Sequence, residues 1–369
     1  MKIGILTVPF NNNYGGFLQA FALKRVLMDM GHKVIFINRR RNRPNKMKNR
    51  IYRLLVKWHL KKDPIAVKQE QISVHTNRFK SQYLAPITNE FYTTRQLERC
   101  LKQRFDCIIV GSDQVWRYRY AEDSIDDFFC NFLRGRKIPH FSYAASMGTD
   151  EMEYPQDKLE VCKELLKDFS SISVREESAA RILYDYFGAL QVVTVLDPTL
   201  LLNRDVYINL FRDKYEQEKN PYILTYILDE DEVLSKEVSQ FASEREILVV
   251  SMKAETGDLF SLDVLQPVEC WLASIYNARY VITDSYHGTV FSIIFHKPFL
   301  VVNNTARGTA RLKNLLNRLH LEERLVATTN GIREVMNRPI DWTTVENSLR
   351  QEKEKSLAFL ESSLKIIKR

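Results

Sequence analysis

The chain has 369 residues, of which 45% are hydrophobic and 27% are charged, with a formal net charge of +8. This length suits two domains better than one core, and the composition is that of a globular protein, which excludes disordered and fibrous classes. Because there is no run of eighteen apolar residues and MKIGILTVPFNNN lacks the long apolar core of a secretory signal, we expect a soluble, cytoplasmic protein.

Strand-like and helix-like segments alternate from the first residue. KIGILTV is followed by the helical GFLQAFALKRVLMDMG and then by KVIFINR, which together make one βαβ unit and predict a parallel sheet. Further strands are expected at 106–113, 140–146, 171–176 and 192–197, with helices at 155–169 and 176–187 between them.

Residues 39–62 carry the whole basic excess. They hold eleven Lys or Arg and no acid, which leaves 54 − 11 = 43 basic against 46 acidic residues elsewhere, a balance of −3. Apolar residues recur at helical spacing from Ile51 to Trp58, a pattern typical of interfacial helices that bind anionic headgroups. The segment thus predicts either peripheral contact with the inner face of a membrane or a solvated basic excursion on its own domain. Nucleic acid is not expected, because no recognised RNA- or DNA-binding module accompanies the charge.

A second βα series follows the motif LDPTLLLNRD. Its strands are expected at 222–228, 247–252, 280–285 and 298–303. The fold class is therefore α/β, with two doubly wound Rossmann-like domains: residues 1–200, and residues 201–342 as the donor-binding domain. The long amphipathic helix 343–369 is expected to pack back and complete the first domain.

Small and polar residues follow the predicted strands. Ligands of open parallel sheets bind outside the carboxyl ends of the strands, so the cleft between the two domains is the expected active site. The residues expected to bind donor or substrate there are Asn13, Tyr14, Gly15, Gly16, Ser112, Asp113, Ser146, Asp284, Ser285 and Gly288. The NNNYGG loop lets a ligand approach the backbone at a helix N-terminus, although a tight turn alone would also explain its glycines.

Two residues at strand ends are candidates for catalysis. Arg175 follows the apolar strand SISV, where its guanidinium could bind an oxyanion in bidentate fashion, or form an ion pair with Glu176 or Glu177. His287 lies in VITDSYHGTVFSIIF, at the turn between a buried strand and an apolar helix, where it would serve as acid, base or anion ligand unless it is a structural histidine. The two side chains could face each other across the cleft.

The five cysteines predict neither a disulfide framework nor a metal site. Cys100, Cys107, Cys130, Cys162 and Cys270 show no CxxC pair and no zinc spacing, so free buried thiols are expected. No metal and no cofactor are expected.

Six blocks, in this order, resemble the polysaccharide pyruvyl transferase family: NNNYGGFLQAFAL, IIVGSDQVW, SYAASMG, SVREESA, LDPTLL and ITDSYHGTVFSIIFHKPF. The resemblance spans about residues 3 to 305 and implies a GT-B-like fold. It also implies transfer of the enolpyruvyl part of phosphoenolpyruvate, as co-substrate, to a sugar of a bacterial cell-surface polysaccharide or its lipid-linked precursor, where a pyruvate ketal closes. Arg175 and His287 match the family's arginine and histidine. DSYHG departs from the DRLHG of many members, which have an arginine two places before the histidine.

Three functions are open at this point. The first is pyruvyl transfer to a glycan or lipid-linked oligosaccharide. The second is a GT-B enzyme that uses a nucleotide sugar or another activated donor, which the DSYHG departure permits. The third is a non-catalytic protein of a glycan locus that kept the fold.

Overall fold

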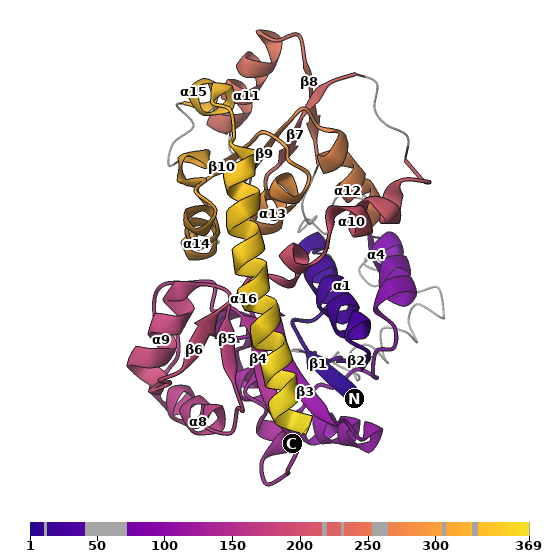
Figure 1. Ribbon diagram of the computed structural model, residues 1–369, viewed down its shortest axis with the longest axis vertical. Coiled ribbons are helices and arrows are strands. Elements are labelled where there is room, and N and C mark those ends of the chain that lie inside the picture. Colours follow the sequence, from indigo (N-terminus) through magenta and orange to yellow (C-terminus); the bar gives the residue numbers. More distant parts are fainter. Residues whose placement is uncertain are drawn as a thin grey trace, which may run out of the picture.

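The computed structural model describes residues 1–10, 13–40, 72–215, 220–229, 232–252, 265–304, 308–326 and 331–368. Two parallel β-sheets lie one above the other along the long axis of the molecule (Figure 1). The first has the order β2-β1-β3-β4-β5-β6, with strands Lys2–Leu6 (β1), Lys33–Ile37 (β2), Cys107–Asp113 (β3), His140–Ala145 (β4), Ile172–Val174 (β5) and Val192–Thr194 (β6). The second has the order β11-β10-β9-β7-β8, with strands Tyr222–Tyr226 (β7), Leu248–Ser251 (β8), Tyr280–Thr283 (β9), Phe299–Val302 (β10) and Leu325–Val326 (β11).

The two sheets share one winding pattern. In each, the first strand lies between the second and the third, so the chain reverses direction across the sheet at that point. Such a reversal leaves a crevice at the carboxyl ends of the two central strands, where ligands of doubly wound sheets bind. These switch points lie between β1 and β3 and between β7 and β9.

Helices cover the sheets and provide the core. In the first half they are Tyr14–Asp29 (α1), Val74–Phe79 (α4), Thr94–Leu97 (α5), Tyr118–Ala121 (α6), Ile125–Phe128 (α7), Gln156–Leu166 (α8) and Glu177–Phe187 (α9). In the second they are Arg204–Phe211 (α10), Glu232–Ser243 (α11), Val268–Asn277 (α12), Tyr286–Ile294 (α13), Ala310–Arg318 (α14), Ile332–Asn337 (α15) and Trp342–Lys368 (α16).

One hydrophobic cluster runs through both halves. It contains Ile5 of β1 and Leu18 of α1 together with Val281 of β9 and Trp271 of α12, all fully buried. Alternate side chains of the first sheet, such as Ile108, pack instead into a second cluster with α8 and α9. Because the first cluster is continuous, the carboxyl ends of the two sheets are held against each other.

Helix α16 contacts both halves, as Figure 1 shows for the yellow helix. Near its start Trp342 stacks on His296, which follows α13. Further along, Phe359 packs against Phe141 of β4 and Ser363 hydrogen-bonds Ser171. The helix thus connects the second half to the face of the first sheet.

Ser356 of α16 provides a test of that connection. The buried backbone N–H of Leu196 donates to its hydroxyl at 2.9 Å. Ser356→Ala leaves this N–H without a partner, which we expect to lower the free energy of unfolding by about 1–3 kcal/mol in urea denaturation. Ser362→Ala, which removes an exposed hydroxyl of the same helix, should change it by less than about 0.5 kcal/mol. Equal effects of the two substitutions would show that α16 is not anchored through Ser356.

The α/β class with two doubly wound halves is confirmed, and three details differ from expectation. The two-residue strand β11 was not predicted, and α13 begins at Tyr286 rather than after the HG turn. Four cysteines are buried as expected, but Cys270 is only half-buried.

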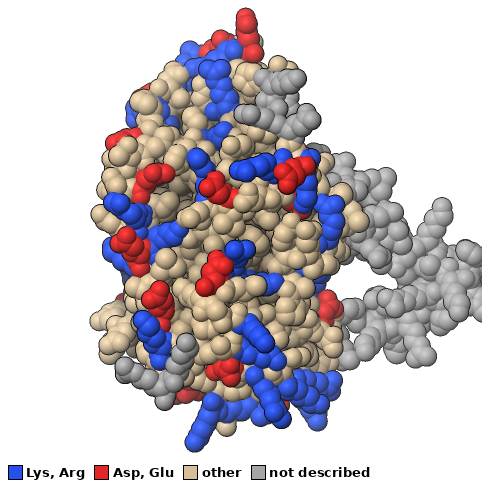
Figure 2. Space-filling view, turned by 45° about the vertical axis from the view of Figure 1, so that its right-hand side comes forward, with Lys and Arg blue, Asp and Glu red and all other residues tan. Residues whose placement is uncertain are grey.

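Charged side chains are unevenly distributed over the surface of the described residues (Figure 2). On the face in Figure 2, acidic and basic side chains mix over the middle, and basic ones gather at the lower end, in the half built on the first sheet. Of the basic segment 39–62, only its first two residues lie within the described residues. Arg39 is buried with its Nε 2.5 Å from Asp127, and Arg40 pairs with Glu90. The proposed interfacial helix lies outside the described residues.

Candidate functional site

His287 lies in the first turn of α13, directly beyond the carboxyl end of β9. Ser285 caps the helix by accepting a hydrogen bond from Gly288 N at 3.3 Å. The imidazole is 7% exposed and lies against Gly15 of α1, so closely that a Cβ at Gly15 would be 2.0 Å from Nδ1. Gly15 therefore provides the space that His287 occupies. This contact joins α1 of the first half to α13 of the second.

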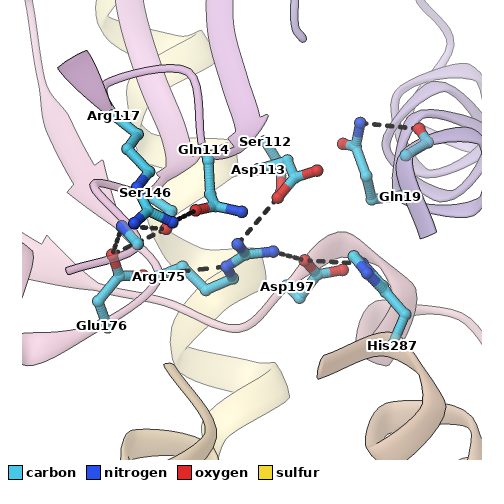
Figure 3. Close-up of polar contacts among 12 residues, drawn as sticks. Gln19, Ser112, Asp113, Gln114, Arg117, Ser146, Arg175, Glu176, Asp197 and His287 are labelled. Carbon is cyan, nitrogen blue, oxygen red and sulfur yellow. Dashed lines mark hydrogen bonds and ion pairs between the residues drawn. The ribbon is translucent and has the colours of Figure 1, made fainter. Parts of the chain in front are cut away.

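Arg175 lies just after β5 and is 2% exposed. Its Nη1 donates to Asp197 Oδ2 at 2.7 Å and its Nη2 to Asp113 Oδ1 at 3.0 Å (Figure 3). Its Nε lies 3.9 Å from Glu176 Oε2, whereas Glu177 is an exposed residue of α9. In this structure Arg175 therefore forms ion pairs within the protein, as the second of its two predicted roles. Its principal partners are Asp197 and Asp113, and Glu176 lies farther away.

Asp197 connects the two residues that were expected to face each other. Its Oδ2 accepts the bond from Arg175 and lies 3.7 Å from His287 Nε2, and its Oδ1 accepts from the backbone and hydroxyl of Thr199. It is fully buried at the start of the 3₁₀ turn Pro198–Leu201. Arg175 and His287 are therefore neighbours of one carboxylate, which joins them across the junction of the halves.

The neighbouring charges keep the carboxylates of Asp197 and Asp113 ionised. Burial alone would raise the pKa of Asp197, but His287 and then Arg175 and Thr199 hold it well below its usual range. Burial would likewise raise the pKa of Asp113, and the nearby charge of Arg175 outweighs it, so that this pKa is also lowered. Both carboxylates are ionised at neutral pH.

A second guanidinium lies next to the cluster. Arg311 of α14 is 9% exposed, with its guanidinium carbon 5.6 Å from the ring centre of Tyr286. That ring also stacks with Arg175, at 4.4 Å. The pKa of Arg311 is lowered by burial and by the charge of Arg175. DSYHG lacks the family's arginine, and Arg311 brings a cation to the same turn from another helix.

Several predicted residues stabilise the local fold. Asn13 caps α1, the Tyr14 hydroxyl donates to Gln266 O, and Asp284 accepts from Leu228 N and from Asn304 Nδ2. Burial raises the pKa of Asp284. Gly288 packs against Thr283, where a Cβ would lie 2.5 Å from the hydroxyl oxygen.

Ser146 and the two residues after it form a group of hydrogen-bond donors, a nest, that surrounds the carboxylate of Glu176. One carboxylate oxygen of Glu176 accepts from the Ser146 hydroxyl at 2.8 Å and from the backbone N–H groups of Met147 and Gly148. Glu176 is fully buried beside Arg175, so this nest helps to fix the end of β5 against the end of β4.

Asp197 and Gln19 were not predicted as site residues, and Glu176 was considered only as an ion-pair partner of Arg175. The sequence offered a signal for Asp197, which is the acidic residue of the LDPTLL block at the end of the predicted strand 192–197. For Gln19 the sequence offered only its position, one helical turn after Gly15. Its amide is oriented by hydrogen bonds to Thr7 and Gly16, which the sequence does not reveal.

Within the described ranges, no group of three His, Cys, Asp or Glu side chains is placed to hold a metal ion. Over the same residues, no helix combines the length and apolar character needed to cross a membrane.

Gly15→Ala should displace the imidazole of His287, because the new methyl group would overlap it. Since His287 is the predicted catalytic residue, we expect turnover to fall by about 10²-fold, a loss that a displacement of about 1 Å can cause. The matched variant is Gly16→Ala, whose Cβ would have no neighbour closer than 3.8 Å and which should keep the melting temperature. The histidine NMR signals, compared with those of His287→Asn, should shift in Gly15→Ala and stay in place in Gly16→Ala. Unshifted signals in Gly15→Ala would contradict the contact.

The fold is similar to that of nucleotide-sugar enzymes of known structure. The MnaA–UDP co-structure from S. aureus superposes with a TM-score of 0.53 at 13% identity, covering 96% of this chain and 91% of that one. A putative UDP-N-acetylglucosamine 2-epimerase from Listeria monocytogenes gives 0.54 at 8% identity, covering 96% and 90%. The UDP-GlcNAc 2-epimerase from Neisseria meningitidis, bound to UDP-GlcNAc, gives 0.50 at 11% identity, covering 97% and 100%. At these identities the likeness concerns the fold alone, which is of the GT-B type.

The search of curated sequences found no match. The sequence pattern of the family described as polysaccharide pyruvyl transferase, in contrast, matches residues 13–305. This range includes Gly15, Arg175, Asp197 and His287, the residues that meet where the two halves join. The chain belongs to the polysaccharide pyruvyl transferase family.

Proposed function

We propose that this protein transfers a pyruvyl group from phosphoenolpyruvate to a sugar and closes a pyruvate ketal on two of its hydroxyls. The observation that carries the proposal is the arrangement of His287. The imidazole lies at the N-terminus of α13, fixed against Gly15, with Nε2 near the ionised carboxylate of Asp197. A carboxylate beside an imidazole holds the ring in one orientation, so this pair is suited to moving a proton.

The chemistry requires that proton. In the first step a sugar hydroxyl adds to C2 of phosphoenolpyruvate while His287 gives a proton to C3, which becomes a methyl group. The proton that the hydroxyl loses returns to His287, so the imidazole is unchanged at the end of the step. In the second step another hydroxyl of the sugar displaces phosphate from C2, and its proton leaves with the phosphate. The products are the ketal and inorganic phosphate, and no redox change occurs.

The carboxylate and phosphate of the donor are negatively charged, so the proposal needs cations close to His287. The Nη1 and Nη2 groups of Arg175 each hold a buried carboxylate, so its role in this proposal is to position Asp197 and Asp113. Arg311, whose guanidinium lies over the ring of Tyr286 in the first turn of α13, would attract the carboxylate or phosphate of the donor together with the positive end of that helix.

A nucleotide-sugar donor is the second candidate. The observation in its favour is that similar structures at TM-scores of 0.50 and above include proteins bound to UDP or UDP-GlcNAc. DSYHG also lacks the arginine that many members of the family have two places before the histidine.

Thermal unfolding with each donor separates the two candidates. A ligand at 100 times its Kd stabilises the folded state by about 2.7 kcal/mol. We expect phosphoenolpyruvate to raise the melting temperature and UDP-sugars to leave it unchanged. Arg311→Gln should reduce the shift, whereas Arg279→Gln, at an exposed arginine of the same half, should retain it. A shift with UDP-sugars alone would favour the second candidate, and no shift with any donor would favour a non-catalytic protein.

The acceptor we propose is a glycan or lipid-linked oligosaccharide of the bacterial cell surface, modified in the cytoplasm or at the inner face of the membrane. Family membership supports the glycan. The basic residues from 39 to 62 support contact with anionic lipids, by composition alone. No cofactor is part of the proposal.

A further inference from the structure

The switch point of the first sheet holds a chain of buried polar groups outside the Arg175–Asp197–His287 cluster. Thr7 follows β1, Ser112 is the last but one residue of β3, and Gln19 projects from α1 above them. All three are buried, with Gln19 and Ser112 at 0% exposure. They lie where a ligand of a doubly wound sheet is expected.

Hydrogen bonds fix the orientation of the Gln19 amide. Its Nε2 donates to Thr7 Oγ1 at 3.1 Å and to Gly16 O at 3.0 Å, which uses both amide hydrogens. Thr7 in turn donates its hydroxyl hydrogen to Ser112 O at 2.9 Å. The amide cannot flip without losing these bonds, so Gln19 Oε1 is held as an acceptor, and it has no partner within the described residues.

Ser112 offers a second unpaired group at the same place. Its hydroxyl is fully buried and has no hydrogen-bond partner in the described part of the chain. In Figure 3 the oxygen of Gln19 is turned toward Ser112 and Asp113. A buried polar group without a partner costs about 1–3 kcal/mol, so two of them at one switch point indicate groups that a ligand satisfies.

These groups adjoin the catalytic residues of the proposed function. Gln19 is four residues after Gly15, so both lie on one face of α1, and Gly15 touches the ring of His287. Asp113, the residue after Ser112, holds Arg175. A molecule bound to Gln19 and Ser112 would therefore present its atoms to His287 and Asp197.

We propose that Gln19 Oε1 and Ser112 Oγ form a subsite for hydroxyl groups of the saccharide acceptor. Gln19 Oε1 can only accept and Ser112 Oγ can donate or accept, and sugar hydroxyls match both. A carboxylate or a fully ionised phosphate has no proton to offer Gln19 Oε1 and would be repelled by ionised Asp113 beside it. The subsite rests on the proposed function only in requiring that the acceptor is a sugar. It would bind that sugar in the same way whichever donor the protein uses.

The test is saccharide binding without a donor, which does not depend on pyruvyl transfer. Saturation-transfer difference NMR with a panel of methyl gluco-, galacto- and mannopyranosides should show binding by the wild-type protein. In Ser112→Ala we expect affinity for the bound sugar to fall about 2- to 10-fold, the loss of one net hydrogen bond, with an unchanged or higher melting temperature. Gln19→Met, of similar length, should lose at least as much affinity.

The matched control is Ser173→Ala. Ser173 is a fully buried serine of β5 whose hydroxyl is paired, donating to Ser142 O and accepting from Ala144 N. Its removal should lower the melting temperature and keep sugar binding, the reverse of Ser112→Ala. Unchanged binding in Ser112→Ala and Gln19→Met, or no binding of any panel sugar by the wild type, would overturn the subsite. Sugar binding by the wild type without any response to phosphoenolpyruvate would instead count against the proposed donor.

Discussion

Asp197→Asn is expected to impair both stability and turnover. The substitution leaves Arg175 with one hydrogen-bonded carboxylate in a fully buried setting and removes the charge beside His287. Breaking a buried ion pair from one side costs about 3–5 kcal/mol, which urea denaturation at pH 7 would measure. Turnover per folded molecule should fall by about 10²-fold, because His287 loses the carboxylate that lies 3.7 Å from its Nε2.

The same variant should change the acid dependence of stability. Because the folded-state pKa of Asp197 is held below its ordinary value of about 3.9, its contribution is fully present above that pH. It is lost as the pH falls from about 4 toward the folded-state pKa. Wild-type stability should therefore decrease steeply below about pH 4, and Asp197→Asn should show a shallower decrease from a lower starting value.

Asp185→Asn is the control for charge alone, since Asp185 is exposed on α9. It should change the free energy of unfolding by less than about 0.5 kcal/mol. If Asp197→Asn were equally mild at pH 7, the ion pairs of Arg175 would not hold this junction together.

His287→Asn is expected to have the largest effect on turnover. A positioned proton donor contributes ~10²–10⁴-fold, and asparagine cannot replace it. The described residues form no hydrogen bond with His287 Nε2, so the loss of stability should come mainly from packing against Gly15 and amount to about 1–2 kcal/mol. Steady-state kinetics on the folded fraction would measure the first effect and urea denaturation the second.

Thermal shifts with phosphoenolpyruvate show whether the variant still binds the donor. A shift close to that of the wild type, combined with the loss of turnover, is the pattern of a residue that acts in the chemical step. Wild-type turnover from a protein destabilised by several kcal/mol would instead make His287 structural.

Much of the fold follows from local patterns. The runs CIIV, FSYAA and YVIT are continuous and apolar because these strands are buried on both faces, and each was predicted as a strand. Strand β11, by contrast, has two residues, too few for any periodicity to show. The start of α13 was misplaced because Ser285, not a residue nearer Val290, provides the cap.

The site is less predictable than the fold, because its partners come from distant positions. Strand-end position alone suggested Arg175 and His287, but the bond from Arg175 to Asp113 spans 62 residues and requires β3, β4 and β5 to be neighbours. Whether a buried arginine binds a ligand or carboxylates of its own chain depends on that three-dimensional arrangement. The contact of Gly15 with His287 depends on the packing of the two halves, which no local pattern encodes.

The most direct measurement of the proposed activity is mass spectrometry of the surface glycan from a strain that lacks this protein, complemented in turn with the wild-type protein and with His287→Asn. The proposal predicts that the glycan loses a pyruvate ketal in the deletion strain, regains it with the wild type and does not regain it with His287→Asn at equal protein level. A glycan that carries the same ketals in all three strains would contradict pyruvyl transfer as the function of this chain.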